Sequence, residues 1–226
     1  MADIGDGYGS ECHFLRWMGR HRKLFDERVS AAVSRPGEAI NWLDFKFAPN
    51  KKWPDAELKG LEFLYDRPGL KAAWERFWPT GGGVQNWDAV GWIGTGLDTE
   101  LLFVEAKAYL KEIKTDCKAK GAGRQKIARA FKATKECLGA ANRAKWMNGY
   151  YQAANRMATL YFVQKEQIPA RMLFVYFLGD RVPGKECPRT EDEWKPAIAA
   201  QWDHLGLAAD HRLANRTHDL FLPISS

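Results

Sequence analysis

The chain has 226 residues, of which 46% are hydrophobic and 27% charged, a composition that fits a single globular domain over residues 1–226. Its four cysteines form no C-x-x-C pair, so we expect reduced thiols. It has no signal-peptide stretch and no run of about eighteen apolar residues, so we expect a cytoplasmic protein without a membrane partner. The net charge of +6 is concentrated in residues 111–145, where eleven lysines and arginines outnumber three acidic residues, and such a block indicates either a polyanion partner or a solvated face.

Residues 1–83 are predicted to form an N-terminal helical part. Apolar residues at helical spacing predict a first helix over 11–33, which Arg35-Pro36-Gly37 ends. Residues 38–53 have no regular pattern. Pro54-Asp55 is typical of a helix start and predicts a short helix through Tyr65, and another short helix fits Leu70–Trp78 before the glycines at 81–83.

Two strands are predicted in the centre of the chain, over 84–93 and 100–110. Residues 94–98 between them contain Gly and Asp, which tolerate the positive φ of a hairpin turn. A long amphipathic helix is predicted over 142–166, followed by a strand over 172–178 that is apolar on both faces. Residues 179–226 are predicted to hold a capped helix from Thr190 to about Leu205 and a last strand over 220–224.

The chemistry of the chain is predicted to centre on the second of these strands. It is apolar except for Glu105 and Lys107, which share a face because side chains alternate along a strand. A hairpin turn centred between Gly96 and Leu97 places Asp88 opposite Glu105. Two facing carboxylates repel one another and favour a cation, and oxygen ligands without His or Cys favour Mg²⁺ or Mn²⁺.

These residues resemble the PD-(D/E)XK nuclease superfamily, which has the restriction-endonuclease-like fold. The resemblance lies in Asp88, a gap of sixteen residues, and Glu105-Ala106-Lys107 in a hairpin, followed by a helix and a buried strand. It covers residues 84–178, the predicted catalytic core. The proline that gives the family the first letter of its name is absent, because Trp87 precedes Asp88. It implies an α/β fold with a mixed central β-sheet flanked by helices (αβββαβ type), with extra helical segments at both ends.

The resemblance also implies roles for individual residues. Asp88 and Glu105 would bind Mg²⁺ or Mn²⁺, with the carbonyl of Ala106 as a further ligand, and Lys107 would orient the attacking water and stabilise charge on the phosphoryl oxygens. Gln152 occupies the place where some members carry a glutamine near the scissile phosphate. Glu112 is a weaker candidate at the same end of the sheet.

We therefore expect a metal-dependent nuclease that acts on nucleic acid, with DNA favoured over RNA. Two alternatives stay open: a nucleic-acid-binding module of the same fold that has lost catalysis, and a protein-interaction domain in which Glu105 and Lys107 form a structural ion pair. The oligomeric state is undetermined, with a homo-oligomer among the options. The residues expected to contact nucleic acid are Lys111, Lys114, Lys118, Lys120, Arg124 and Lys126.

Overall fold

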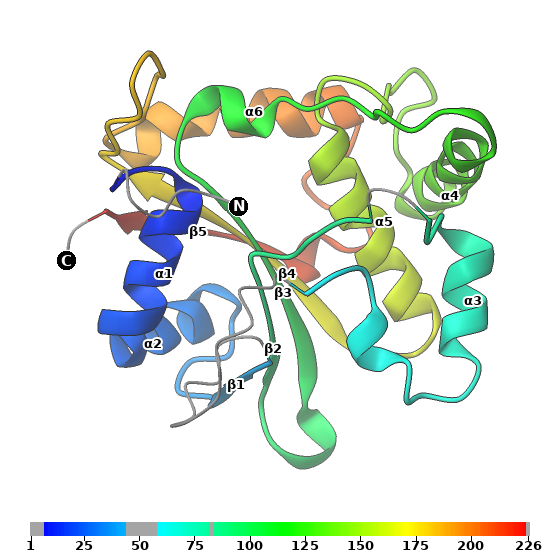
Figure 1. The fold of residues 1–226 in the computed structure, drawn as a ribbon, viewed down its shortest axis with the longest axis horizontal. Helices are drawn as coiled ribbons and strands as arrows, with labels where there is room; N and C mark the ends of the chain where they lie inside the picture. The colour runs from blue at the N-terminus through cyan, green and yellow to red at the C-terminus, as the bar shows by residue number, and fades with distance from the viewer. Residues whose placement is uncertain (1–6, 44–57, 82–83, 225–226) are drawn as a thin grey trace.

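The fold is α/β and is built on one mixed, open five-stranded sheet, seen here in a computed structural model that describes residues 7–43, 58–81 and 84–224 (Figure 1). The strand order is β1-β2-β3-β4-β5. β2 pairs antiparallel with both β1 and β3, whereas β3, β4 and β5 are parallel to one another. Their bounds are β1 Ile40–Trp42, β2 Ala89–Ile93, β3 Glu100–Lys107, β4 Ala170–Leu178 and β5 Thr217–Pro223.

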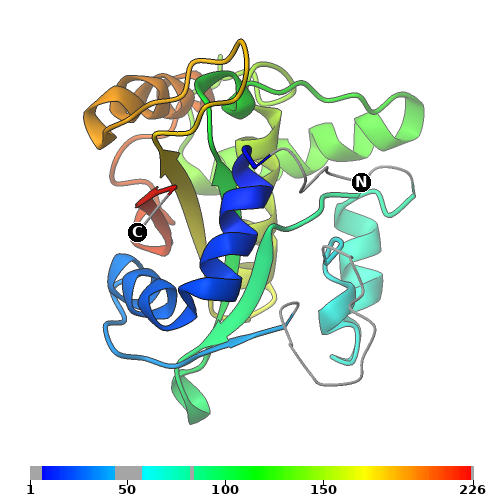
Figure 2. The ribbon, with the colours of Figure 1, turned by 60° about the vertical axis from the view of Figure 1, so that its left-hand side comes forward.

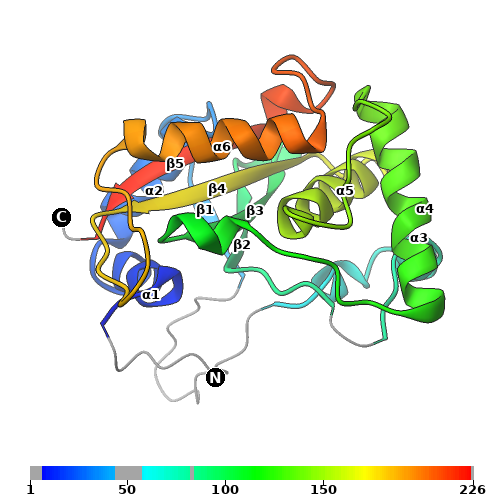
Figure 3. The ribbon, with the colours of Figure 1, turned by 90° about the horizontal axis from the view of Figure 1, so that it is seen from above.

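Helices cover both faces of the sheet (Figure 1). On one face lie α1 (Ser10–Arg20) and α2 (Arg22–Ala32), and Figure 2 shows α1 lying across the strands. The other face is covered by α3 (Leu70–Phe77), α4 (Gly121–Leu138), α5 (Tyr151–Lys165) and α6 (Glu191–Leu205), with α6 beside β4 and β5 in Figure 3. Two hydrophobic cores result, one on each side of the sheet. None of the helices in the described ranges is long and apolar enough to cross a membrane.

The alternation of β3 decides which face receives its charges. Leu102, Val104 and Ala106 point into the core under α1 and α2, whereas Leu101 and Phe103 point into the core under α5. Glu105 and Lys107 continue the second series, so they lie on the α5 side. The chain thereby carries a carboxylate and an ammonium to the end of a buried strand, against the first turns of a helix.

The predicted hairpin is confirmed, with the register that the turn centre implies. Ala89 pairs with Val104 and Ile93 with Glu100, and continuing this register by one residue sets Asp88 opposite Glu105. The strands are shorter than predicted, because β2 begins at Ala89 and β3 ends at Lys107. Gly94 is required in the turn: its φ is 95°, and an added Cβ would lie 2.8 Å from the carbonyl oxygen of Asp98.

Several predicted elements differ from the observed ones in the N-terminal part. The helix expected over 11–33 is two helices, because His21 between them has φ −122° and ψ 27°, outside helical geometry. The break lets both helices place apolar side chains on the same face of the sheet. The stretch 38–53, which lacks a pattern, contributes β1 at Ile40–Trp42.

The prediction of a helix from Pro54 to Tyr65 is wrong for residues 58–65, the part of it that the structure describes. Pro54-Asp55 and the glycines at 82 and 83 lie outside the described residues. Residues 58–65 hold an isolated bridge between Lys59 and Asn86 and a single 3₁₀ turn at Glu62–Leu64. The helix predicted over 70–78 is confirmed as α3.

Two further corrections concern the helices after the hairpin. The helix predicted from residue 142 begins only at Tyr151, because Gly149 has φ 81° and Thr115 forms a backbone bridge with Tyr150. The basic stretch before it contains an unpredicted helix, α4, which buries Ile127, Phe131 and Leu138. At the C-terminal end the predictions are confirmed, since α6 is capped by the Thr190 hydroxyl and β5 follows it.

Candidate active site

A pocket of about 440 Å³ opens where the hairpin meets the N-terminus of α5. It brings together three of the predicted catalytic residues, Asp88, Glu105 and Gln152, from positions up to 64 residues apart. The first turns of α5 form one wall and the segment leading into β2 forms another. The pocket is lined by Val84, Gln85, Asn86, Asp88, Glu105, Thr115, Tyr151, Gln152, Asn155 and Arg156.

Asp88 is half-buried and immediately precedes β2. Its Oδ2 accepts a hydrogen bond of 2.6 Å from the backbone N–H of Ala106 on the neighbouring strand. Burial and, to a smaller extent, the negative charge of Glu105 raise the pKa of Asp88 to about 7, against the opposing effects of Lys107, the Ala106 N–H and Arg156. Among the described residues it forms no salt bridge. An ionised Asp88 is therefore in a place that a cation would stabilise.

Glu105 is 2% exposed and is held by two cations. The Lys107 ammonium donates to its Oε1, and the Nε–H of Arg156 donates to its Oε2 at 2.7 Å, with a terminal guanidinium nitrogen 2.5 Å from the same oxygen. Burial by itself would raise the pKa of Glu105, but the charges of Arg156 and Lys107 outweigh it and hold that pKa below its ordinary value. Glu105 is thus ionised and fully paired.

Lys107 is buried on the same face as Glu105, as predicted, but it does not line the pocket. Burial alone would lower the pKa of Lys107, and the carboxylates of Glu105, Glu112 and Asp88 reverse this effect, so its pKa is raised and the ammonium stays charged. Glu112, the weaker candidate, lies outside the pocket. Its oxygens accept hydrogen bonds from the Ala108 backbone at 2.6 Å and the Ser10 hydroxyl at 2.7 Å, which ties α1 to the end of β3.

Arg156 is the site residue that the sequence reasoning missed. It is 3% exposed and, besides Glu105, its guanidinium contacts the Asn86 carbonyl at 2.6 Å, the Asn155 side chain at 2.8 Å and the Trp87 ring at 4.4 Å. The signal that could have found it is its spacing of four from Gln152, which puts both residues on one face of a helix. With Asp88, Glu105 and Lys107 it completes a cluster of two carboxylates and two cations.

Gln152 lines the pocket from the first turn of α5. Its backbone N–H donates to the Thr115 hydroxyl at 2.8 Å, so a residue from the basic segment satisfies one of the free N–H groups at the start of this helix. The positive end of the α5 dipole points towards the pocket and favours an anionic ligand there.

Two carboxylates that could hold a cation line the pocket. Within the described residues there is no cluster of three or more His, Cys, Asp or Glu arranged to share a metal, so the carboxylate donors here are Asp88 and Glu105, and both oxygens of Glu105 also pair with Lys107 and Arg156. Two facing carboxylates without nitrogen or sulfur ligands fit Mg²⁺ or Mn²⁺. Ala106, the third predicted ligand, has its side chain in the opposite core and gives its N–H to Asp88.

The six basic residues expected to contact nucleic acid do not line this pocket. Lys111 and Lys114 line a different one, next to Tyr150 and Lys185. Lys118, Lys120 and Arg124 are exposed in and before the first turn of α4. Lys126 is only half-exposed, because its ammonium donates to the Glu75 carbonyl at 2.9 Å.

Comparisons of the chain with protein-family models, with curated proteins and with solved structures find no match. The geometry of the pocket and the chemistry of the residues around it are therefore the basis for assigning a function.

Proposed function

We propose that this protein is a Mg²⁺- or Mn²⁺-dependent nuclease of the PD-(D/E)XK type that hydrolyses phosphodiester bonds, with DNA as the favoured substrate. One observation carries the proposal: Asp88 and Glu105 lie opposite each other across a hairpin and line one pocket, and Lys107 follows on the same face of β3. The order of elements also supports it: α1 and α2 precede three antiparallel strands, with α3 inserted between β1 and β2, and α4, α5 and the parallel strand β4 follow.

In this proposal the residues of the pocket have distinct roles. Asp88 and Glu105 hold the cation, which would polarise the scissile phosphate and lower the pKa of a water molecule. Lys107, whose ammonium lies against Glu105, orients the nucleophile and offsets negative charge in the transition state. Gln152 and the N-terminus of α5 bind phosphate oxygens, and Arg156 positions Glu105.

The test is cleavage of supercoiled plasmid by the purified protein. We expect nicked and linear products with Mg²⁺ or Mn²⁺ and none when EDTA removes the metal. Labelled single-stranded DNA and RNA in parallel reactions report the substrate preference. An Asp88→Asn variant purified in the same way controls for a contaminating nuclease. Intact plasmid with both metals, across a range of pH and salt, would contradict the proposal.

A second candidate function is a nucleic-acid-binding module without catalysis. The observation that favours it is the complete pairing of Glu105 by Lys107 and Arg156, which balances the charge of the cluster without any metal. The cleavage reactions together with a gel-shift assay separate the two candidates. A binding module would shift the plasmid in the gel and would leave it uncut with either Mg²⁺ or Mn²⁺.

Binding of DNA through the basic segment should depend steeply on salt. If Lys118 and Lys120 contact phosphates, log affinity falls with log salt concentration, with a slope of about −0.9 per contact, because each contact releases condensed counterions. The Lys118→Gln Lys120→Gln variant should then reduce the slope by roughly 1.8. Lys23→Gln, an exposed lysine on α2, is the matched control and should leave the slope unchanged. A wild-type slope in the double variant would remove these lysines from the interface.

A further inference from the structure

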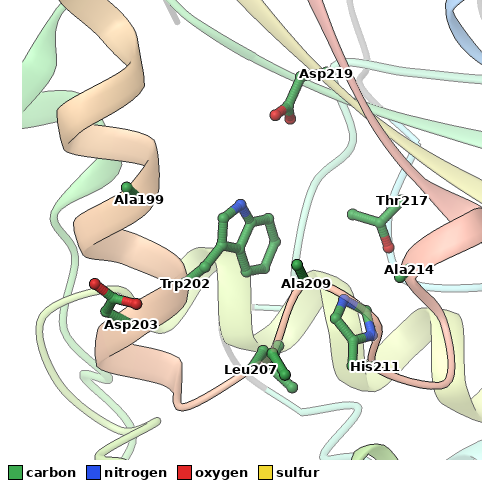
Figure 4. Close-up of a pocket in the computed structure, with 10 residues that line it drawn as sticks. Ala199, Trp202, Asp203, Leu207, Ala209, His211, Ala214, Thr217 and Asp219 are labelled. Atoms are coloured by element: carbon green, nitrogen blue, oxygen red, sulfur yellow. The ribbon is translucent and has the colours of Figure 1, made fainter.

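A second pocket, of about 270 Å³, lies between α6, β5 and the loop that joins them (Figure 4). It shares no lining residue with the candidate active site. Its walls are largely small and apolar, with Ala199 from α6, Ala209 from the loop and Ala214 from the turn before β5. These alanines leave room around one large ring, the indole of Trp202, which stands among the lining side chains in Figure 4.

The position of the Trp202 ring is fixed from behind. Its indole packs edge-on against Phe174 of β4, with the ring centroids 5.7 Å apart. Because the side chain is only half-buried, the remainder of its surface is open to the pocket. An aromatic ring held in this way offers a flat, electron-rich surface to a ligand.

The charge in this pocket is negative. Asp219 of β5 lies beside Phe174 in the sheet, and its carboxylate projects into the space above Trp202 in Figure 4. The Asp219 side chain is exposed at the pocket, no described residue forms a hydrogen bond or a salt bridge with it, and desolvation by the surrounding atoms raises the pKa of Asp219 to about 6. Asp203 adds a second carboxylate at the edge, and the lining contains no Lys or Arg although the chain carries a net charge of +6.

The other polar side chains of the pocket have partners or no charge. The Thr217 hydroxyl donates to the Leu213 carbonyl at 3.0 Å. The Nδ1 of His211 accepts the Leu213 N–H at 3.2 Å, and burial lowers the pKa of His211 below its ordinary value, so the ring is neutral near pH 7. The carboxylates of Asp219 and, at the edge, Asp203 are therefore the charged groups of the pocket that lack a counterpart among the described residues.

We propose that this pocket binds a guanidinium group, stacked on Trp202 and paired with Asp219. A guanidinium is planar, is weakly hydrated, stacks on aromatic faces and donates two parallel hydrogen bonds to a carboxylate. Both surfaces that it needs are present here, on two different elements that face one space. The group has two sources, a small guanidinium compound or an arginine side chain of another protein, and the same chemistry recognises both.

Calorimetric titration with three probes that share a butyl chain tests the proposal. Butylguanidinium should bind, and butylurea, which is neutral and of the same shape, should bind about tenfold or more weakly because it lacks the charge-assisted hydrogen bonds. Butylammonium, which is charged but not planar, should also bind more weakly than butylguanidinium. Equal affinity for butylurea, preference for butylammonium, or no binding of butylguanidinium at millimolar concentration would each overturn the proposal.

Asp219→Asn keeps the shape of the side chain and removes its charge, so it should weaken butylguanidinium binding by about tenfold or more at an unchanged melting temperature. Asp210→Asn, an exposed carboxylate of the same loop outside the pocket, is the matched control and should bind like the wild type. In the wild-type protein the probe should shift the indole N–H resonance of Trp202, identified by its loss in Trp202→Phe, and no shift would contradict the assignment. If an acetyl-Ala-Arg-Ala-amide peptide binds more tightly than butylguanidinium, the partner is a protein. If the peptide does not bind, the ligand is a small molecule.

Discussion

Asp88→Asn is expected to remove cleavage while leaving the fold at least as stable as the wild type. An asparagine oxygen can still accept the hydrogen bond that Ala106 donates to Oδ2, so the hairpin keeps this contact. The change removes one of two facing carboxylates, and the raised pKa of Asp88 shows that its ionised form costs stability in the folded state. Loss of an outer-shell partner already lowers the activity of metal sites by roughly 10–100-fold, and we expect at least about 100-fold for a direct ligand.

Three measurements check this expectation: the single-turnover cleavage rate, the melting temperature in EDTA, and the shift of that temperature with Mn²⁺. A metal present at about 100 times its Kd stabilises the wild type by about 2.7 kcal/mol, and the variant should lack most of this gain. Asp116→Asn is not a suitable control, since its carboxylate accepts the Gly149 N–H. Asp98→Asn, in the hairpin turn, is a better one. A variant that is unstable and still active would show that Asp88 is structural.

The hairpin and its register could be predicted from the sequence because both depend on local rules. Side chains alternate with a fixed period, and a turn of Gly and Asp fixes the pairing of the two strands, so locating the turn locates Asp88 opposite Glu105. The two-sided apolar pattern of β4 identified a buried strand in the same way. The capped start of α6 depends on a single short motif, Thr190 to Glu193.

The features that could not be predicted depend on contacts between distant parts of the chain. Arg156 pairs with Glu105, 51 residues away, and only the packing of α5 on the sheet brings them together. The same packing sets the start of α5. The backbone N–H groups of Tyr151 and Gln152 donate to the carbonyl and the hydroxyl of Thr115, so the helix begins at Tyr151 and not at residue 142. The sequence did not predict α4, because its many lysines and arginines indicated a binding segment. The apolar face of this helix is narrow and is recognised only once the helix packs on the sheet.

Lys107 and Arg156 pair with the same carboxylate, but we expect different effects when each is replaced by methionine. The first change should lower the cleavage rate and the second should lower the stability of the fold. Lys107 makes its hydrogen bond to Glu105 alone, and its loss leaves that carboxylate paired with Arg156. Lys107→Met should therefore fold and should lose less stability than Arg156→Met. Because the ammonium acts on developing charge, single-turnover cleavage should fall by about 100-fold or more while Mn²⁺ and DNA still bind.

Arg156→Met should instead lose stability. Arg156 is the more buried of the two cations, and its removal strands the Asn86 carbonyl and leaves Glu105 with one partner. Breaking a buried ion pair costs about 3–5 kcal/mol, which lowers the melting temperature of a chain of this length by roughly 6–20 °C. Lys195→Met, from an exposed pair with Asp192, should alter neither property. If Lys107→Met lost as much stability as Arg156→Met and cleaved at the wild-type rate, both cations would be structural and the catalytic role of Lys107 would be wrong. If the two variants separate as expected, one buried cluster serves two purposes, with Arg156 holding Glu105 in place and Lys107 available for the chemical step.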